Sequence, residues 1–511
     1  MKKKAKKDSA DRVSAASASP AKVSFTQVSP ARKAAFDVLL AVERGHFHSD
    51  DLMRSKAVNV LSAPDRHLAT ALVLGVLRWQ IQLDHATNAL LTRPNAKLDA
   101  EIRVALRLGA FQIFHMDRIP ARAAIDESVG LAKQAGHRFA SGMVNAVLRK
   151  LAASDATLVL DTEGGRGFNP RNEPTKSTGG LALDQLLSPN PPANLALAYA
   201  HPAWLVERWV RFYGIEAARD LCAHGQRQPA TTIRLVDTNA EAELLQAGIK
   251  LEPGSLLTSA RTVVSGDITA SAAFLEGRIR MQDEGSQLVA ELAAVSLDQK
   301  LEQIVDACAA PGGKTLILAE RNPEARIVAC EQSAPRLDAL RQRLAPYADR
   351  IECRLADAGT LPAYRRAQNG DPAFDLALVD VPCSGTGTLG RNPEIRHRLR
   401  LEDLPRQAER QFAILSAALS AVRPGGSVIY STCSLEQEEN EQVVASVLAA
   451  ARHARIVSLN ARISALCNAN ILAPGAADKL LACLTHEGTL RLLPGTFQTD
   501  GFFIALIERI R

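Results

Sequence analysis

Two cysteines of this sequence stand where a thiol could act as a nucleophile. Cys383 lies three residues after Asp380 in a loop rich in glycine, and Cys433 follows a second apolar run and precedes a serine. A thiolate is a strong nucleophile, and a carboxyl group close to it can donate a proton to the group under attack. The spacing therefore indicates nucleophilic catalysis that is assisted by an acid and a base.

Such groups suit a reaction at a carbon that is itself a poor nucleophile, such as C5 of a cytosine. A thiolate that adds to C6 turns C5 into an enamine-like carbon, which can attack a methyl sulfonium. An acid at N3 favours the addition, and a base must then remove the C5 proton so that the thiolate can leave. By itself each cysteine is more typical of a small buried hydrophobic residue, and the residues alone do not say which thiol attacks.

A glycine-containing loop at residues 306–315 has the features of a cofactor loop. It follows an apolar run and ends in Gly312, Gly313 and Lys314 before a threonine. A P-loop needs glycine where this sequence has Cys308, so a Walker motif is excluded. The glycines allow close approach of the backbone, and the helix that follows presents its N-terminus to an anion such as the carboxylate of S-adenosylmethionine.

Acidic residues follow the next two apolar runs of the chain. Glu331 ends the run at 326–331, and Asp357 follows the run at 351–355. A carboxylate at the end of a parallel strand can accept both hydroxyls of a ribose or face an adenine amino group. Each acid is a weak signal alone, whereas three consecutive loops with suitable groups favour a nucleoside-containing cofactor.

Positioning these loops requires strands and helices that alternate, and residues 284–511 have this pattern. Continuous apolar strands between helices predict a doubly wound, mostly parallel α/β sheet, whose ligands lie beyond the carboxyl ends of the strands. We expect strands at 304–308, 326–331, 351–355, 376–380 and 427–431. We expect helices at 313–320, 335–344, 404–422 and 438–450.

The rest of the chain is predicted to form separate parts. Helical apolar spacing predicts an all-helical domain at 31–160, and a mixture of short strands and helices predicts a small α/β module at 199–283. A segment rich in Gly, Pro, Asn, Thr and Ser predicts a flexible linker or insertion at 161–198. Residues 1–30 form a basic tail of low complexity that we expect to be disordered.

The charge is uneven along the chain. Residues 1–33 contain nine Lys and Arg against two Asp, a net +7, so the rest of a chain of net +6 carries about −1. Such a tail can hold RNA phosphates or simply keep the protein in solution.

No run of about 18 apolar residues is present, so we expect no membrane span. Scattered cysteines without CxxC spacing favour reduced thiols in a cytoplasmic protein, and histidines without metal-ligand spacing lead us to expect no metal.

Taken together, these motifs resemble the Sun family of RNA cytosine-5 methyltransferases, most of all its bacterial branch that acts on 16S rRNA. The resemblance covers residues 31–160 and 199–511. It implies a NusB-like RNA-binding helical domain, a small α/β module and a Rossmann-like class I methyltransferase domain. In the catalytic part it rests on residues 308–315, 380–387, 392–396, 432–434, 493–495 and 500–503, and in the helical part on 65–70, 74–78 and 144–149.

The resemblance implies a role for each matching residue. Cys433 matches the nucleophile of the RNA enzymes, and Cys383 matches the cysteine that assists product release. In DNA cytosine methyltransferases the cysteine after proline is the nucleophile instead. Asp380 matches the acid that contacts the cytosine, and Lys314 matches a possible contact to the base. The implied S-adenosylmethionine pocket consists of Cys308, Ala309, Ala310, Pro311, Gly312, Gly313, Lys314, Glu331, Asp357 and Asp380.

Three positions depart from the family pattern. Glu331 replaces the usual ribose-binding aspartate and is longer by one methylene, although it can still bind two hydroxyls. Gly390 and His397 replace an arginine and a tryptophan that are common in the expected substrate loop. The RNA contacts of that loop are therefore left open.

The resemblance implies a monomeric, cytoplasmic enzyme that methylates C5 of a cytosine in 16S rRNA through a covalent Cys433–C6 intermediate, on the free or early assembling small subunit. Two alternatives remain. The chain could be an RNA-binding or antitermination-type factor with an inactive methyltransferase body, but retention of both cysteines and Asp380 argues against this. The same chemistry could also act on tRNA or another RNA, because the NusB-like domain favours rRNA only by analogy.

Overall fold

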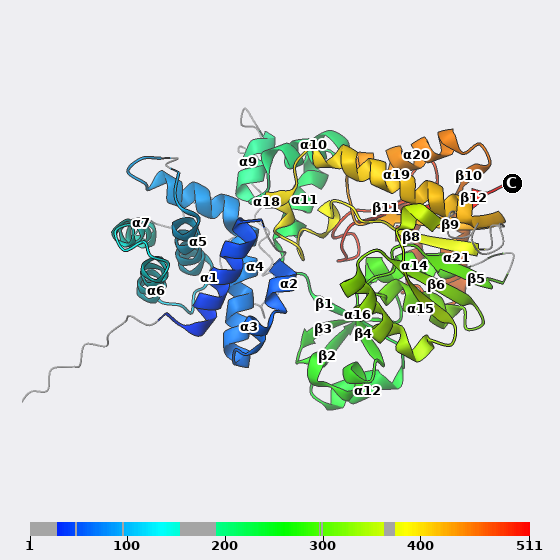
Figure 1. Cartoon of the computed structure of the whole chain (residues 1–511), viewed down its shortest axis with the longest axis horizontal. Coiled ribbons are helices and arrows are strands. Elements are labelled where there is room, and N and C mark those ends of the chain that lie inside the picture. The colour runs from blue at the N-terminus through cyan, green and yellow to red at the C-terminus, as the bar shows by residue number, and fades with distance from the viewer. Residues whose placement is uncertain are drawn as a thin grey trace, which may run out of the picture.

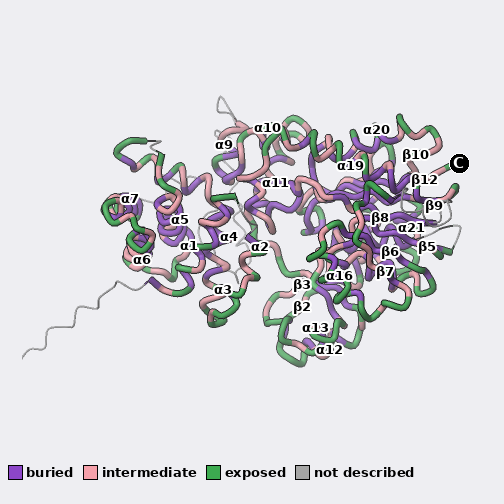
Figure 2. The backbone as a smooth tube through the Cα atoms, viewed as in Figure 1, coloured by how far each residue is buried: buried purple, intermediate pink, exposed green. Residues whose placement is uncertain are grey.

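The computed structural model describes residues 28–45, 49–94, 97–153, 191–295, 297, 300–361 and 374–510. A group of helices lies at one end of the molecule and a large sheet lies at the other, with a smaller sheet and a further helical layer between them (Figure 1). Buried backbone concentrates in the large sheet, whereas exposed residues follow the outer helices (Figure 2). Residues 1–27 of the predicted basic tail lie outside the described residues. None of the helices in the described ranges is long and apolar enough to cross a bilayer.

The N-terminal part confirms the all-helical prediction, and its helices pack around one apolar core. Gly75 of α4 faces Phe111 of α5 so closely that a Cβ atom at position 75 would lie 2.0 Å from the phenyl ring. The two helices therefore approach this closely only with glycine at that position. The helices are α1 (Pro30–Glu43), α2 (Ser49–Met53), α3 (Lys56–Asn59), α4 (Ala63–Ala89), α5 (Ala100–His115), α6 (Ala121–Gln134) and α7 (Ser141–Ala153).

A second helical layer joins this part to the large sheet, and it corrects the expected domain boundaries. The last eight residues of the predicted linker form a helix, while residues 161–190 lie outside the described ranges. Trp209 and its neighbours share one apolar cluster with Leu389 and Leu435, which belong to loops of the large sheet. Residues 199–226 therefore pack with the catalytic part rather than with the small module. The helices are α9 (Pro191–Ala198), α10 (Ala203–Tyr213) and α11 (Ile215–Gln226).

The small module is a four-stranded antiparallel sheet in the order β2-β3-β1-β4. One face carries Ile233, Leu235 and Ile279, which pack under two short helices. The strands are β1 (Thr231–Leu235), β2 (Lys250–Pro253), β3 (Ala260–Ser265) and β4 (Ile279–Met281), and the helices are α12 (Asn239–Gln246) and α13 (Ala272–Leu275).

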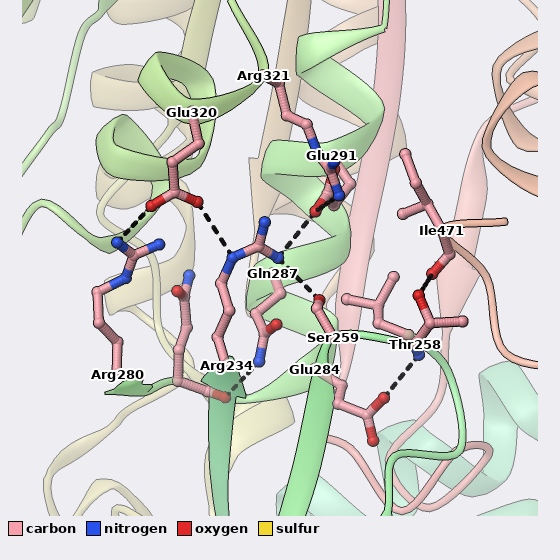
Figure 3. A network of polar contacts seen from close by, with 12 residues as sticks. Arg234, Thr258, Ser259, Arg280, Glu284, Gln287, Glu291, Glu320, Arg321 and Ile471 are labelled. Carbon is pink, nitrogen blue, oxygen red and sulfur yellow. Dashed lines mark hydrogen bonds and ion pairs between the residues drawn. The ribbon is translucent and has the colours of Figure 1, made fainter. Parts of the chain in front are cut away.

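The other face of this sheet is held to the catalytic part by charged side chains (Figure 3). Arg234 of β1 lies 2.8 Å from Glu291, which is fully buried and also pairs with Arg321 at 2.8 Å. Arg280 of β4 pairs with Glu320 at 2.5 Å. Loss of one partner of such a buried pair typically costs about 3–5 kcal/mol, because it leaves a charge without compensation. The network therefore fixes the small sheet against the catalytic part.

The large sheet confirms the mostly parallel prediction and has the order β10-β12-β9-β8-β5-β6-β7. Strands β9 to β7 along this order are parallel, whereas β12 and its neighbours β10 and β11 are antiparallel. The strands are β5 (Gln303–Asp306), β6 (Arg326–Glu331), β7 (Ile351–Leu355), β8 (Phe374–Asp380), β9 (Val422–Thr432), β10 (Ala454–Val457), β11 (Leu490–Leu492) and β12 (Phe502–Arg509).

Helices cover both faces of this sheet through two separate apolar clusters. One cluster contains residues of α14, α15, α16, α21 and α22, and the other contains residues of α19 and α20. Strand order reverses at β5, which has β6 on one side and β8 on the other, and ligands of such sheets bind at that switch point. The helices are α14 (Glu284–Ala294), α15 (Gly313–Arg321), α16 (Ala334–Leu344), α18 (Ile395–Arg398), α19 (Asp403–Ala421), α20 (Glu441–Ala450), α21 (Asn460–Asn468) and α22 (Ala476–Ala482).

Candidate active site

The two cysteines lie in contact beyond the carboxyl ends of β8 and β9. These strands are parallel neighbours, and Asp380 at the end of β8 stands opposite Ser431 of β9. The loops that follow therefore begin side by side, and the Sγ atoms of Cys383 and Cys433 are 3.4 Å apart. Both side chains are partly buried. At this distance one thiol can donate a hydrogen bond to the other sulfur.

An ion pair lies next to the two thiols. Lys314, in the first turn of α15, places Nζ 2.7 Å from Oδ2 of Asp380, and the Ser431 hydroxyl donates to Oδ1 at 2.7 Å. Burial lowers the pKa of Lys314, but the charge and hydrogen bond of Asp380 outweigh this effect, so the pKa is raised overall. The ammonium group also lies 5.9 Å from the centre of the Phe502 ring. The proton of this pair therefore resides on lysine.

The surroundings of the two thiols are unequal. A hydrogen bond with Cys433 and burial raise the pKa of Cys383 well above its usual value, and the negative charge of Glu439 adds to this effect. Lys314, in contrast, interacts electrostatically with Cys433. A cation thus acts on Cys433 and an anion on Cys383, and the raised pKa of Cys383 keeps that thiol protonated.

The loop between β5 and α15 is held against α16. Arg336 donates to the carbonyl of Ala310 at 3.0 Å, and Arg343 donates to the carbonyl of Pro311 at 3.1 Å. Gly312 has φ +99°, and a Cβ atom there would lie 2.9 Å from Leu340 of α16. We expected Gly312 to leave room for a ligand. The structure gives another reason for glycine, which is a left-handed backbone packed against a helix.

The acidic residues lie at the strand ends as predicted. Glu331 ends β6, is buried, and accepts a hydrogen bond from the Ser333 amide at 2.8 Å, with Arg336 at 3.4 Å. Asp357 after β7 is exposed and accepts from the Gly359 amide at 2.9 Å. With the β5 loop and Asp380, they surround the switch point at β5 on both sides.

A further buried carboxylate, that of Asp306, lies beside the β5 loop. Asp306 at the end of β5 is 1% exposed, and its Oδ2 accepts from the Thr315 hydroxyl at 2.7 Å. Its Oδ1 has no hydrogen-bond partner among the described residues, and burial raises the pKa of Asp306 to about 6. An unpaired polar atom of this kind beside a glycine loop is what a pocket for a polar cofactor requires.

Two family models and several known proteins match this chain. Residues 294–508 match the family model described as 16S rRNA methyltransferase RsmB/F, and residues 29–153 match the NusB family. The probable ribosomal RNA small subunit methyltransferase B of Bacillus subtilis is 31% identical over 94% of this chain and 98% of its own length. Ribosomal RNA small subunit methyltransferase B of Pseudomonas syringae is 30% identical over 87% of this chain and 90% of its own.

This chain belongs to the RsmB/F family of rRNA methyltransferases. It is therefore an RNA methyltransferase, and its methyl donor is S-adenosylmethionine. The crystal structure of PH0851 has the same fold, with a TM-score of 0.71 at 23% identity, over 94% of this chain and 99% of that one. The likeness includes the helical layer and the small sheet as well as the methyltransferase sheet, since so much of the chain is covered.

The loop after Cys383 is the expected substrate loop, in which the RNA contacts of Gly390 and His397 were left open. Gly390 is buried, and its carbonyl accepts from Arg78 of α4 at 2.7 Å. The imidazole Nε2 of His397 lies 2.7 Å from the carbonyl oxygen of Leu77. A Cβ atom on Gly390 would lie 3.1 Å from Pro229, so a larger residue would meet protein there. Both positions contact the helical parts of the chain.

Two further residues extend this junction between the NusB-like helices and the catalytic loop. Arg396 is buried and donates to the carbonyls of Arg78 at 2.9 Å and Gly225. The Ser49 hydroxyl donates to the carboxylate of Glu394 at 2.8 Å. The segment that follows Cys383 is thus anchored on α2, α4 and α11.

Sequence reasoning missed a buried carboxylate behind the two thiols. Glu439 accepts hydrogen bonds from Ser384 and Ser434, the residues that directly follow the two cysteines. The signal was available, because four of the six residues at 436–441 are glutamates and the run begins three residues after Cys433. Such a run is typical of a solvent-exposed surface, whereas Glu436 and Glu439 are both fully buried here.

Proposed function

We propose that this protein transfers a methyl group from S-adenosylmethionine to C5 of a cytosine in 16S rRNA, with Cys433 as the covalent nucleophile. The observation that carries the proposal is the contact between two thiols, Cys433 and Cys383, beside the Lys314–Asp380 ion pair. One thiol is needed to activate the base, and a second group is needed to release it.

The residues present fit the cofactor that the family uses. Residues 308–314, Glu331 and Asp357 would hold it, with the orphaned oxygen of Asp306 at the floor of the same loop. When bound, it supplies an electrophilic methyl group to the carbon that the enzyme has activated. Because β5 separates Glu331 and Asp357 from Asp380, the cofactor side and the base side of the site fall on opposite sides of this strand.

The chain's own residues then carry out the addition. The Cys433 thiolate forms a bond to C6, and the displaced ring electrons move toward N3. The Lys314–Asp380 pair supplies the hydrogen bond or proton at N3, and Lys314 is the member that holds the proton. C5 thereby becomes nucleophilic toward the methyl group that the bound cofactor would supply.

Cys383 is suited to the release step because its environment changes during the reaction. Once the Cys433 sulfur is bonded to C6 it carries no charge, so the hydrogen bond to a thiolate that keeps Cys383 protonated is lost. Cys383 can then lose its proton to solvent and take the proton from C5. The electron pair of the C5–H bond forms the C5–C6 double bond, and the C6–S pair returns to Cys433. Any proton taken up by N3 returns to the Lys314–Asp380 pair.

Other parts of the proposal concern partners. The NusB-like helices at 29–153 are proposed to bind rRNA, with help from the basic segment that precedes them. We propose that the protein acts as a monomer, and we place it in the cytoplasm with its ribosomal substrate.

Bisulfite sequencing of 16S rRNA tests the substrate directly. A strain that lacks the protein should lose protection at one cytosine, and the wild-type gene should restore it whereas Cys433→Ala should not. Unchanged protection throughout 16S rRNA, with loss at a cytosine of tRNA or another RNA, would refute the proposed substrate and retain the chemistry. No loss in any RNA would refute the proposed reaction.

A further inference from the structure

The buried carboxylate of Glu439 is not used by the mechanism above, and its hydrogen bonds converge on the two thiol loops. It ends the short helix Gln437–Glu439 and is 0% exposed. Oε1 accepts from the Ser384 amide at 2.8 Å and from the Gln411 side chain at 3.0 Å. Oε2 accepts from the hydroxyls of Ser434, at 2.5 Å, and of Ser384. Across the described ranges, no lysine or arginine forms an ion pair with it.

These bonds determine the separation of the two cysteines. Ser384 and Ser434 directly follow Cys383 and Cys433, and their hydroxyls are 3.0 Å apart. A buried carboxylate without a cation depends on neutral donors, so moving either loop would leave Glu439 short of donors in a dry site. One side chain thus links both loops at the position that gives the 3.4 Å contact of the sulfur atoms.

The neighbouring residue and the strand below hold Glu439 itself in place. The Thr432 hydroxyl donates to Oδ1 of Asn440 at 2.5 Å, and the Asn440 amide donates to the carbonyl of Ser434 at 2.9 Å. The Tyr430 hydroxyl donates to the carbonyl of Glu439 at 2.5 Å. The segment that carries the carboxylate is therefore fixed to the end of β9, before Cys433, and to Ser434, directly after it.

The charge of Glu439 also acts on the thiol of Cys383. It contributes to the raised pKa of Cys383, whereas the cation that interacts with Cys433 is Lys314. The titratable and charged groups that face the thiol pair are Glu439, Tyr430, Lys314 and Asp380.

We propose that Glu439 is a positioning residue that sets the two thiols at contact distance and keeps the shared proton on Cys383, so that Cys433 is the sulfur free to attack. The inference deepens the proposed function and rests on it for the role of Cys433. Glu439 acts through the two serines and through its charge, without touching the substrate.

Thiol alkylation in the full-length protein without RNA tests the proposal independently of methylation. Iodoacetamide labelling of Cys433 and Cys383 would be measured separately by peptide mass spectrometry from pH 6 to 9. In the wild type, Cys433 should react at lower pH than Cys383. In Glu439→Gln, which keeps the size but loses the charge, Cys383 labelling should move to lower pH and the Cys433-to-Cys383 rate ratio at pH 7 should fall by about tenfold, or about one pKa unit.

Glu436→Gln is the matched control. Glu436 is also fully buried and lies three residues earlier in the same segment, but it pairs with Arg208 and Trp209 rather than with the thiol loops. Its removal should leave the labelling order unchanged. An unchanged order in folded Glu439→Gln, or an equal change in Glu436→Gln, would overturn the proposal.

A second variant covers the case in which Glu439→Gln does not fold. Ser384→Ala removes one hydroxyl donor to Glu439 and keeps the charge. Adduct formation with RNA that carries 5-fluorocytosine should slow by about tenfold, while the affinity for S-adenosylmethionine is retained. An unchanged adduct rate would contradict the positioning role. A wild type that forms no adduct at all would instead reject the proposed function. The alkylation experiment, which uses no RNA, would still test the positioning role of Glu439.

Discussion

Asp306 is a carboxylate whose burial should be visible in the pH dependence of stability. Its pKa is raised from an ordinary 3.8 to about 6, so the folded state holds this proton more tightly than the unfolded state does. Stability therefore falls as the pH rises from about 4 to about 6. The full effect is at most about 3 kcal/mol, since one pKa unit corresponds to about 1.4 kcal/mol.

Asp306→Asn removes this ionisation and keeps an acceptor for the Thr315 hydroxyl. We expect the variant to gain stability relative to the wild type as the pH rises through that window. Chemical unfolding of both proteins between pH 4 and 8, without cofactor, measures the difference. A constant difference across this range would show that Asp306 does not titrate abnormally in the folded protein.

At the scale of single residues, the sequence indicated which side chains react but not which side chains contact them. Cys383 and Cys433 could be placed together because each follows an apolar strand and parallel strands end at one edge of a sheet. The ion pair of Lys314 with Asp380 could not be foreseen, since it depends on how far the first turn of α15 reaches across the sheet. Glu439 was missed because its burial arises from the packing of the two cysteine loops against α19.

At the scale of elements, the loop between β5 and α15 depends on Gly312. A residue with a side chain at φ +99° is strained, and its Cβ would press against Leu340. We expect Gly312→Ala to lower the free energy of unfolding by about 1–3 kcal/mol and to weaken S-adenosylmethionine binding by displacing the loop.

Gly142→Ala provides the control for this substitution. Gly142 lies in α7, far along the chain from the loop, and a Cβ atom there would meet nothing within 4 Å. Its replacement should be neutral or slightly stabilising, because alanine favours helix. Equal unfolding free energies and calorimetric affinities for the two variants would contradict the special role of the loop.

The parallel strands were the most predictable elements. The predicted bounds of β6 and β7 agree with the structure to the residue. β9 begins at Val422, five residues earlier than predicted, and it includes Pro424, Gly425 and Gly426, residue types that usually weaken a strand. The antiparallel strand β12 was not predicted, since residues 500–503 were treated only as part of a motif.

At the scale of the whole molecule, the NusB-like helices and the catalytic loops form one packed body. Arg78 and Arg396 bond across the junction, and both are buried. Pattern analysis along the chain predicts separate domains, because it contains no information about contacts between distant segments. Removing residues 1–160 would therefore disturb the catalytic loop as well as any RNA contact.

Removal of residues 1–27 alone is the cleaner test of RNA binding by the basic segment. It leaves every described helix in place and removes seven Lys and Arg against two Asp. We expect weaker binding to 16S rRNA and a shallower dependence of affinity on salt, because fewer phosphates are neutralised. The affinity for S-adenosylmethionine should not change. Titrations at several salt concentrations that give equal affinities and slopes for both proteins would assign RNA binding to the folded body instead.

The central claim, covalent catalysis by Cys433 with release assisted by Cys383, is tested most directly by denaturing gel electrophoresis of cysteine variants with substrate RNA and S-adenosylmethionine. Cys433→Ala should form no adduct, even with RNA that carries 5-fluorocytosine, because no thiol adds to C6. Cys383→Ala should accumulate a protein–RNA adduct with natural cytosine, because attack and transfer proceed while elimination stalls. An adduct in Cys433→Ala with none in Cys383→Ala would reverse the roles of the two thiols, and no adduct in any protein despite confirmed methylation would remove covalent catalysis from the mechanism.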